Sequence, residues 1–233
     1  MDTRWIFGDN GLPGIKRLAM DANQELAPLK ITCTSTRCQD NLHCFRLTQR
    51  QRREGPAGRC RTCGIELVDW KRVHRREIRD AKHTVAALQL ELIRHHFWHL
   101  TMTEYAENYA RRKGKLKLLD AVHHRITQTV GSPFHPLQGR QTPRETSPTA
   151  NAVHYAQHAT ASCCRACLEE WHGIPTDRDL TEEELAYLTE LAMLYIQKKI
   201  PDLDRDGQQI PRNPHRRVRE TAGLLATQET HAH

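Results

Sequence analysis

The segment HATASCCRACLEEWH, residues 158–172, holds three of the eight cysteines of this 233-residue chain and has a histidine at each end. On a helix, residues three or four apart share a face, so Cys167 can pair with Cys163 or with Cys164. Thiolates and imidazoles at such short spacings are what tetrahedral zinc requires. We therefore predict a metal site here. Its candidate ligands are His158, Cys163, Cys164, Cys167 and His172. At least one of the candidate ligands is surplus, and it either packs in the core or donates a hydrogen bond to a ligand.

The longer segment from Gln157 to Pro175, followed by LTEEE at residues 180–184, resembles a bacterial and phage family of domains of unknown function. The motifs QHATA, CCR, CLE and WHGIP mark that family. Upstream, GRQTP at residues 139–143 resembles the family's G-[KR]-Q-T-P turn, and His99-Leu100 resembles its RFHL-like segment. The resemblance covers about residues 94–200 and implies a compact helical domain, but it implies no activity. Residues 1–90 then form an extension that shorter members lack.

Hydrophobic spacing predicts a mainly α-helical fold. Thr181 and Glu184 form a capping box at the start of the last helix. Apolar side chains from Ile78 onward repeat at steps of three and four, and the stripe ends in His95 and His99, which predicts one continuous helix. These two histidines are candidates for additional metal ligands or outer donors. Other helices are expected over residues 103–113, 116–130, 151–158 and 162–171, with a proline-rich loop over 131–150.

The remaining five cysteines lie between residues 33 and 63. Cys60-Arg-Thr-Cys63 is typical of a zinc knuckle, because the glycine that follows tolerates the required turn. We predict a zinc-ribbon-like module over residues 33–73, with a short strand over residues 65–68. Its zinc ion would be bound by Cys38, Cys44, Cys60 and Cys63. Since the gap between the first two is long for a knuckle, Cys33 or His43 could replace one of them.

The net charge of +7 arises entirely between Phe45 and Lys82, where twelve Lys and Arg accompany five Asp and Glu. A dense basic stretch is expected of a surface that binds nucleic-acid phosphates. A solvated face balanced by distant acidic residues would have the same composition. The residues expected to contact DNA or RNA are Arg50, Arg52, Arg53, Arg59, Arg61, Lys71, Arg72, Arg75 and Arg76.

Composition predicts a cytoplasmic protein. An apolar content of 38% and a mean hydropathy of −0.72 describe a small core under a polar surface. No apolar run approaches the ~20 residues of a membrane span, and no signal pattern is evident. Thiols stay reduced in the cytoplasm, which favours metal sites over disulfides. The expected organisation is an irregular lead-in (1–32), the ribbon module (33–73), a helical domain (74–200) and a disordered tail (201–233).

Three functions remain open from the sequence, and catalysis is undecided. The first is a zinc protein that binds nucleic acid through its basic ribbon. The second is a metal-dependent nuclease or hydrolase that uses the His/Cys site with Glu169 or Glu170 as the base, although no acidic pair suits two-metal chemistry. The third is a zinc-stapled module that binds a protein partner. A zinc deaminase is disfavoured, because the H-x-E and P-C-x-x-C motifs are both broken.

Overall fold

The computed structural model describes residues 31–55, 57–134 and 142–211. Their β pairing is limited to two isolated bridges, so the predicted mainly α-helical class is confirmed. None of the described helices is long and apolar enough to cross a membrane. Two 3-10 helices occupy Cys38–Asp40 (η1) and Ile78–Asp80 (η2). The α-helices are α1 (Gln49–Glu54), α2 (Trp70–Val73), α3 (Ala81–Leu88), α4 (Leu92–His99), α5 (Glu104–Val130), α6 (Ala152–Ala159), α7 (Arg165–His172) and α8 (Glu182–Lys199).

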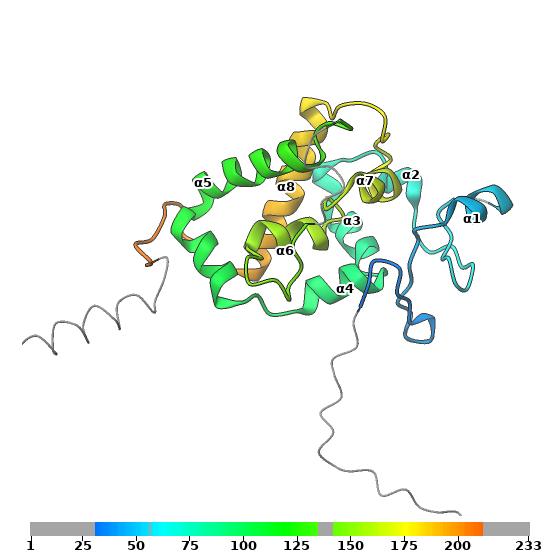
Figure 1. Ribbon diagram of the computed structural model, residues 1–233, viewed down its shortest axis with the longest axis horizontal. Coiled ribbons are helices and arrows are strands. Elements are labelled where there is room, and N and C mark those ends of the chain that lie inside the picture. Colours follow the sequence, from blue (N-terminus) through cyan, green and yellow to red (C-terminus); the bar gives the residue numbers. More distant parts are fainter. Residues whose placement is uncertain (1–30, 56, 135–141, 212–233) are drawn as a thin grey trace, which may run out of the picture. The chain divides into compact units, whose positions relative to one another are not determined.

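The helical core is built from α4, α5, α6 and α8. Helix α8 packs against α5 and α6, and α6 also packs against α4 and α5 (Figure 1). Along α5 the buried residues follow one another at steps of four, from Ala106 to Val130. The predicted capping box of α8 is present, since Thr181 Oγ1 accepts from the Glu184 backbone and Glu184 accepts from the Thr181 backbone.

Helix α5 is kinked at Gly114, and the segment that follows α8 docks at this kink. Gly114 has φ +65°, a backbone conformation that side chains with a β-carbon resist. The next two residues donate backbone hydrogen bonds to Asp204 and Arg205, at 2.9 and 3.2 Å. The sequence predicted a helix end at Gly114, and the structure places a kink there within α5.

Residues 201–211 fall in the stretch that the sequence predicted as a disordered tail, yet they are held against α5. Leu203 is 2% exposed. The Gln208 backbone N–H donates to the Arg111 carbonyl at 2.9 Å, and Arg111 pairs with Asp202. Docking on α5 therefore extends the ordered chain beyond Pro201. Residues 212–233 of the predicted tail lie outside the described residues, as do residues 1–30 of the predicted lead-in.

The continuous helix predicted from Ile78 is interrupted at residues 89–91. His43 forms a parallel bridge with Glu91 at this point. The His43 N–H donates to the Leu90 carbonyl at 2.8 Å, and the Leu92 N–H donates to the His43 carbonyl at 2.9 Å. Local spacing predicts a helix, but pairing with a strand-like segment about 50 residues earlier in the chain breaks it. This pairing fixes His43 against the start of α4.

An aromatic cluster joins residues 45–70 to the helical core. Phe45 and Trp171 are 0% and 1% exposed and meet edge to face, with ring centroids 5.7 Å apart. Trp70 lies 5.1 Å from Trp171 and donates from Nε1 to the Gly58 carbonyl. The predicted strand over residues 65–68 is absent, and Ile65 and Leu67 are 43% and 38% exposed.

Candidate metal centre

A tight turn brings Cys38 and His43 to the same place. Arg37 and Leu42 form an antiparallel bridge, with backbone hydrogen bonds of 2.7 and 3.1 Å. Between them lie η1 and Asn41, whose φ of 57° lets the chain reverse. Cys38 and His43 flank this turn, so their side chains can reach one point.

The second pair of ligands comes from the knuckle. The Gly64 N–H donates to the Cys60 carbonyl at 2.9 Å, and Gly64 has φ +77°. The Cys60 N–H donates to the Ile65 carbonyl at 2.8 Å, which closes the turn. Glycine at position 64 is thus required by the turn, as the sequence indicated.

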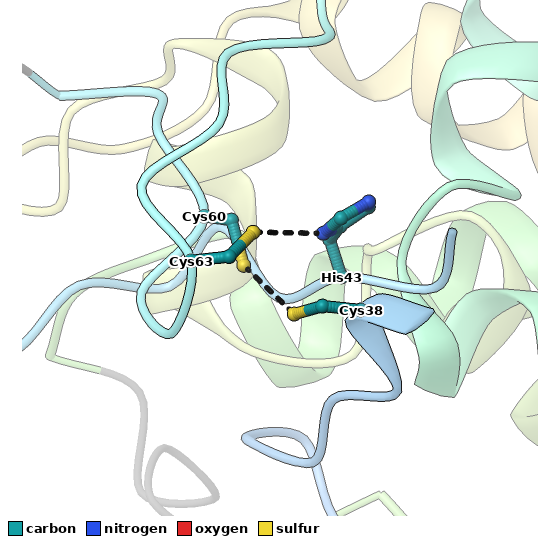
Figure 2. Close-up of side chains that lie close together, drawn as sticks. All are labelled: Cys38, His43, Cys60 and Cys63. Atoms are coloured by element: carbon teal, nitrogen blue, oxygen red, sulfur yellow. Dashed lines mark hydrogen bonds between the residues drawn. The ribbon is translucent and has the colours of Figure 1, made fainter. Parts of the chain in front are cut away.

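Four donor atoms converge from these two turns (Figure 2). One nitrogen of His43 and the sulfurs of Cys38, Cys60 and Cys63 all lie within 4.8 Å of one another. The Cys38 and Cys60 sulfurs are 3.8 Å apart, and the Cys63 sulfur is 3.5 Å from His43 Nδ1. Tetrahedral zinc with its usual bond lengths would separate two sulfurs by about 3.8 Å, and a sulfur from a nitrogen by about 3.5 Å. The measured distances therefore fit a metal ion at the centre.

The second nitrogen of His43 prepares the first one for metal binding. Nε2 lies 3.1 Å from Asn41 Oδ1, which only accepts hydrogen bonds. Nε2 must therefore carry the proton, and Nδ1 keeps a free lone pair that faces Cys63. Outer hydrogen bonds of this kind fix the tautomer and ring orientation of metal-binding histidines.

The thiols differ in how readily they ionise. Burial raises the pKa of Cys60, but backbone N–H groups of Cys63, Cys44 and Thr62 outweigh it and lower the pKa to about 6. The pKa of Cys38 is raised to about 11, first by burial and then by the neighbouring thiols Cys63 and Cys60. The Cys60 thiolate is thus favoured by the turn itself, whereas Cys38 needs a cation beside it to ionise.

Cys44 and Cys33 lie outside this group. The structure places His43, one of the two replacements that the spacing left open, where the sequence predicted Cys44. Cys44 is 0% exposed and its sulfur donates to the Cys33 carbonyl at 3.3 Å. Burial, and then the charge of Glu91, raise its pKa to about 12, so it behaves as a neutral core thiol.

The second group contains Cys163, Cys164 and Cys167, whose sulfurs lie within 4.8 Å of one another. The Cys167 sulfur is 3.7 Å from that of Cys163 and 3.4 Å from that of Cys164. The loop before α7 turns through Ala161, which has φ +56°, and Cys164 is the N-cap of α7. Both groups could therefore hold a metal ion.

His158 and His172, predicted as ligands of the second group, lie outside it because each one binds a backbone carbonyl. His158 Nε2 donates to Thr142 at 3.1 Å, and His172 Nε2 donates to Thr160 at 2.9 Å. His158 also stacks on Phe97 at 4.7 Å. Burial, and then Arg94, lower the pKa of His158 to about 4, and burial is also the largest cause that lowers the pKa of His172 to about 4. Both rings serve as neutral donors in the core.

The histidines of α4 also lie away from both groups. His95 and His99 stack on each other, with ring centroids 3.9 Å apart and His99 Nδ1 bonded to the His95 carbonyl. Neither belongs to the two groups among the described residues that could hold a metal ion.

Many of the predicted nucleic-acid-binding residues form ion pairs. Arg52 binds both Glu169 and Glu170, which are the two bases that a hydrolase would have used. Arg50, Arg72, Arg75 and Arg76 pair with Glu54, Asp80, Glu77 and Glu184. Four of the predicted residues make no ion pair with a described carboxylate, namely Arg53, Arg59, Arg61 and Lys71.

Residues 82–197 match the model of a protein family described as a domain of unknown function (DUF4186). This match supports the predicted resemblance to a family of unknown function for the helical part of the chain. It includes the group at Cys163–Cys167 and excludes the group at Cys38–Cys63. No solved structure matches the chain.

Proposed function

We propose that this protein is a zinc-binding protein whose first metal site is formed by Cys38, His43, Cys60 and Cys63. The convergence of four donor atoms at the distances of a zinc tetrahedron carries this proposal. Four protein ligands leave no position for water, so the site is structural rather than catalytic. A reducing compartment such as the cytoplasm would keep its thiols available for zinc.

Zinc content of single variants tests this site. Cys60→Ser and His43→Gln should each lose one zinc ion per chain, measured by mass spectrometry of the purified protein. Cys44→Ser is the matched control, because Cys44 is adjacent to His43 and buried but outside the group. If Cys44→Ser loses zinc and His43→Gln keeps it, the ligand set is the one expected from spacing. If none of the three variants loses zinc, the first site does not exist.

A second proposed property is nucleic-acid binding by the module over residues 33–73. Its support is the set of cations without an ion pair, of which Arg53 and Lys71 are exposed. Two of them adjoin α1, because Arg59 donates to the Gln51 carbonyl and Gln51 donates to the Arg61 carbonyl. Rigid attachment to a zinc site would hold such side chains in place for phosphate contacts, which carry little sequence information.

Salt dependence tests this second property. Each phosphate contact contributes about −0.9 to the slope of log K against log salt on duplex DNA, so four contacts predict a slope of about −3 to −4. Replacing Arg53, Arg61 and Lys71 together with Gln should reduce it to about −1. The control replaces Arg72 and Arg75 with Gln, since carboxylates already pair with these two, and should leave the slope unchanged. Failure to bind DNA or RNA in dilute buffer would favour a protein partner.

A further inference from the structure

The second cysteine group is buried beside two arginines. Cys163 and Cys167 are 6% and 3% exposed. Arg94, 1% exposed, points its guanidinium at both sulfurs, with Nη2 3.1 Å from Cys167 and Nη1 3.8 Å from Cys163. A neutral thiol is a weak acceptor, so a buried guanidinium aimed at sulfur is best satisfied when that sulfur is a thiolate.

Cys33, near the beginning of the described chain, lies close to the second cysteine group. It lines one small cavity together with Arg94, Cys167 and Trp171, and this cavity is too narrow to admit water. The backbone there is fixed on both sides, because Arg144 donates to the Ile31 carbonyl and the Cys44 sulfur donates to the Cys33 carbonyl. The Cys33 thiol also interacts electrostatically with Arg46 and Arg94, the two arginines that interact with Cys163 and Cys167.

We infer that Cys33, Cys163, Cys164 and Cys167 form a second zinc site with four thiolate ligands. The sulfur distances within the three-cysteine group are close to the edge of about 3.8 Å in a zinc–thiolate tetrahedron. Cys33 is not within 4.8 Å of all three other sulfurs, so its side chain closes onto the group when the metal binds. Neither of the two histidines near this loop belongs to the cysteine group, and Cys33 lines the same cavity as Cys167, so Cys33 is the candidate for the fourth position.

Two arginines would offset most of the charge of such a site. Zinc with four thiolates carries two negative charges and Glu91 adds a third, against two positive charges on Arg46 and Arg94. Arg94 is also bound to Glu91 at 3.0 Å, which fixes the guanidinium in place. The site would join residue 33 to the loop before α7 and would be closed, because the cavity has no room for a water ligand. It does not depend on the zinc site proposed above.

Alkylation of the cysteines in the folded protein tests the inference. Cys33 is half-buried, so iodoacetamide should label it rapidly in chelator-treated protein. In the zinc-loaded protein, labelling of Cys33, read by peptide mass spectrometry, should fall at least tenfold. The same protection should persist in Cys60→Ser, which removes only the first site. Equal labelling with and without zinc overturns the inference, and loss of protection in Cys60→Ser assigns Cys33 to the first site instead.

Variants provide an independent measurement. Cys33→Ser should lose one zinc ion per chain, and Cys33→Ser with Cys60→Ser should lose two, whereas the matched control Cys44→Ser should lose none. Cobalt substitution in the Cys60→Ser background reports on this site alone, because the sulfur-to-cobalt absorbance grows with each Co–S bond. Adding Cys33→Ser should reduce that absorbance by at least a quarter. Unchanged zinc and cobalt signals in Cys33→Ser overturn the inference while leaving the first site unaffected.

Discussion

The carboxylate of Glu91 is the negative charge that pairs with Arg94 inside the protein. Glu91→Gln measures how much that charge contributes to the free energy of unfolding. Both side chains are nearly inaccessible, at 2% and 1% exposure. A single oxygen, Oε2, accepts from Arg94 Nε at 3.0 Å and from Trp171 Nε1 at 2.8 Å. The amide oxygen of Gln can accept both hydrogen bonds, so Glu91→Gln removes charge with little change of shape.

The loss of unfolding free energy expected for Glu91→Gln depends on whether zinc is bound. In the zinc-free protein the thiols are neutral, and Glu91→Gln leaves the Arg94 charge unpaired in the core. Breaking a buried pair in this way costs about 3–5 kcal/mol. In the zinc-loaded protein the thiolates of Cys163 and Cys167 still face Arg94, so the loss should fall to about 1.5–3 kcal/mol, the value of a hydrogen bond to a charged group.

Urea unfolding followed by circular dichroism, with zinc and with chelator, measures both values. The matched control is Glu54→Gln, which removes the same kind of carboxylate from the exposed Arg50–Glu54 pair. That change should cost no more than about 0.5 kcal/mol. Equal losses for Glu91→Gln in the two conditions would show that Arg94 does not face thiolates. A loss below about 1 kcal/mol in both would refute the buried-charge argument itself.

Two further predictions concern the helical core. Gly114→Ala should destabilise the protein by about 1–3 kcal/mol in urea unfolding, because φ is +65° and a β-carbon would lie 2.3 Å from the Asp206 carbonyl carbon; a neutral result would mean that residues 204–208 do not dock at the kink. Acid should weaken the fold between pH 6.5 and about 4, since His158 and His172 have pKa values lowered to about 4 and the unfolded chain takes up protons first. These two histidines together contribute up to about 2.7 kcal/mol per pH unit to the slope with chelator present, and His172→Gln should lower the slope by about 1.4 kcal/mol per pH unit.

The first metal site shows what cysteine spacing can predict. Cys38, Cys60 and Cys63 were expected as ligands, since their spacing and Gly64 restrict the turns that can hold them. The choice between His43 and Cys44 was beyond the sequence, because neighbouring side chains in an extended segment point to opposite sides. The bridge between His43 and Glu91 fixes the segment so that a His43 nitrogen, and not the Cys44 sulfur, lies among the donor atoms, and such pairing between distant segments has no local signal.

The second cysteine group shows what the spacing of residues cannot predict. Spacing indicated correctly that the cysteines of residues 163–167 lie together, but it also added His158 and His172. Those rings instead donate hydrogen bonds to the carbonyls of Thr142 and Thr160. These carbonyls need a donor only once the loop has folded, so the sequence gives no sign of the pairing. Cys33 was considered only for the ribbon, because nothing in the sequence shows that it meets a loop about 130 residues away.

Helices were predictable where local signals act alone, as in the capping box of α8. The structure differs from the prediction where a distant segment intervenes: the predicted helix is broken at residues 89–91, and Leu203, in the predicted tail, is buried by docking on the kink in α5. Glycine at position 114 carried a signal for both the kink and the docking. Only an interruption of the helix was inferred, as a helix end at Gly114, since the sequence does not identify the segment that fills the space left by the missing β-carbon.

The module over residues 33–73 and the helical domain share one core, and this affects what metal loss would do. Phe45 and Trp70 come from the module and Trp171 from α7, yet the three rings form one cluster. The Trp171 indole also donates to Glu91, which pairs through its backbone with the metal-binding segment at His43. Loss of the first zinc ion would therefore loosen the attachment of His43 and, through Glu91, the setting of Arg94 beside the second cysteine group. Because the two groups are connected by buried contacts, zinc binding at one should strengthen zinc binding at the other without being required for it.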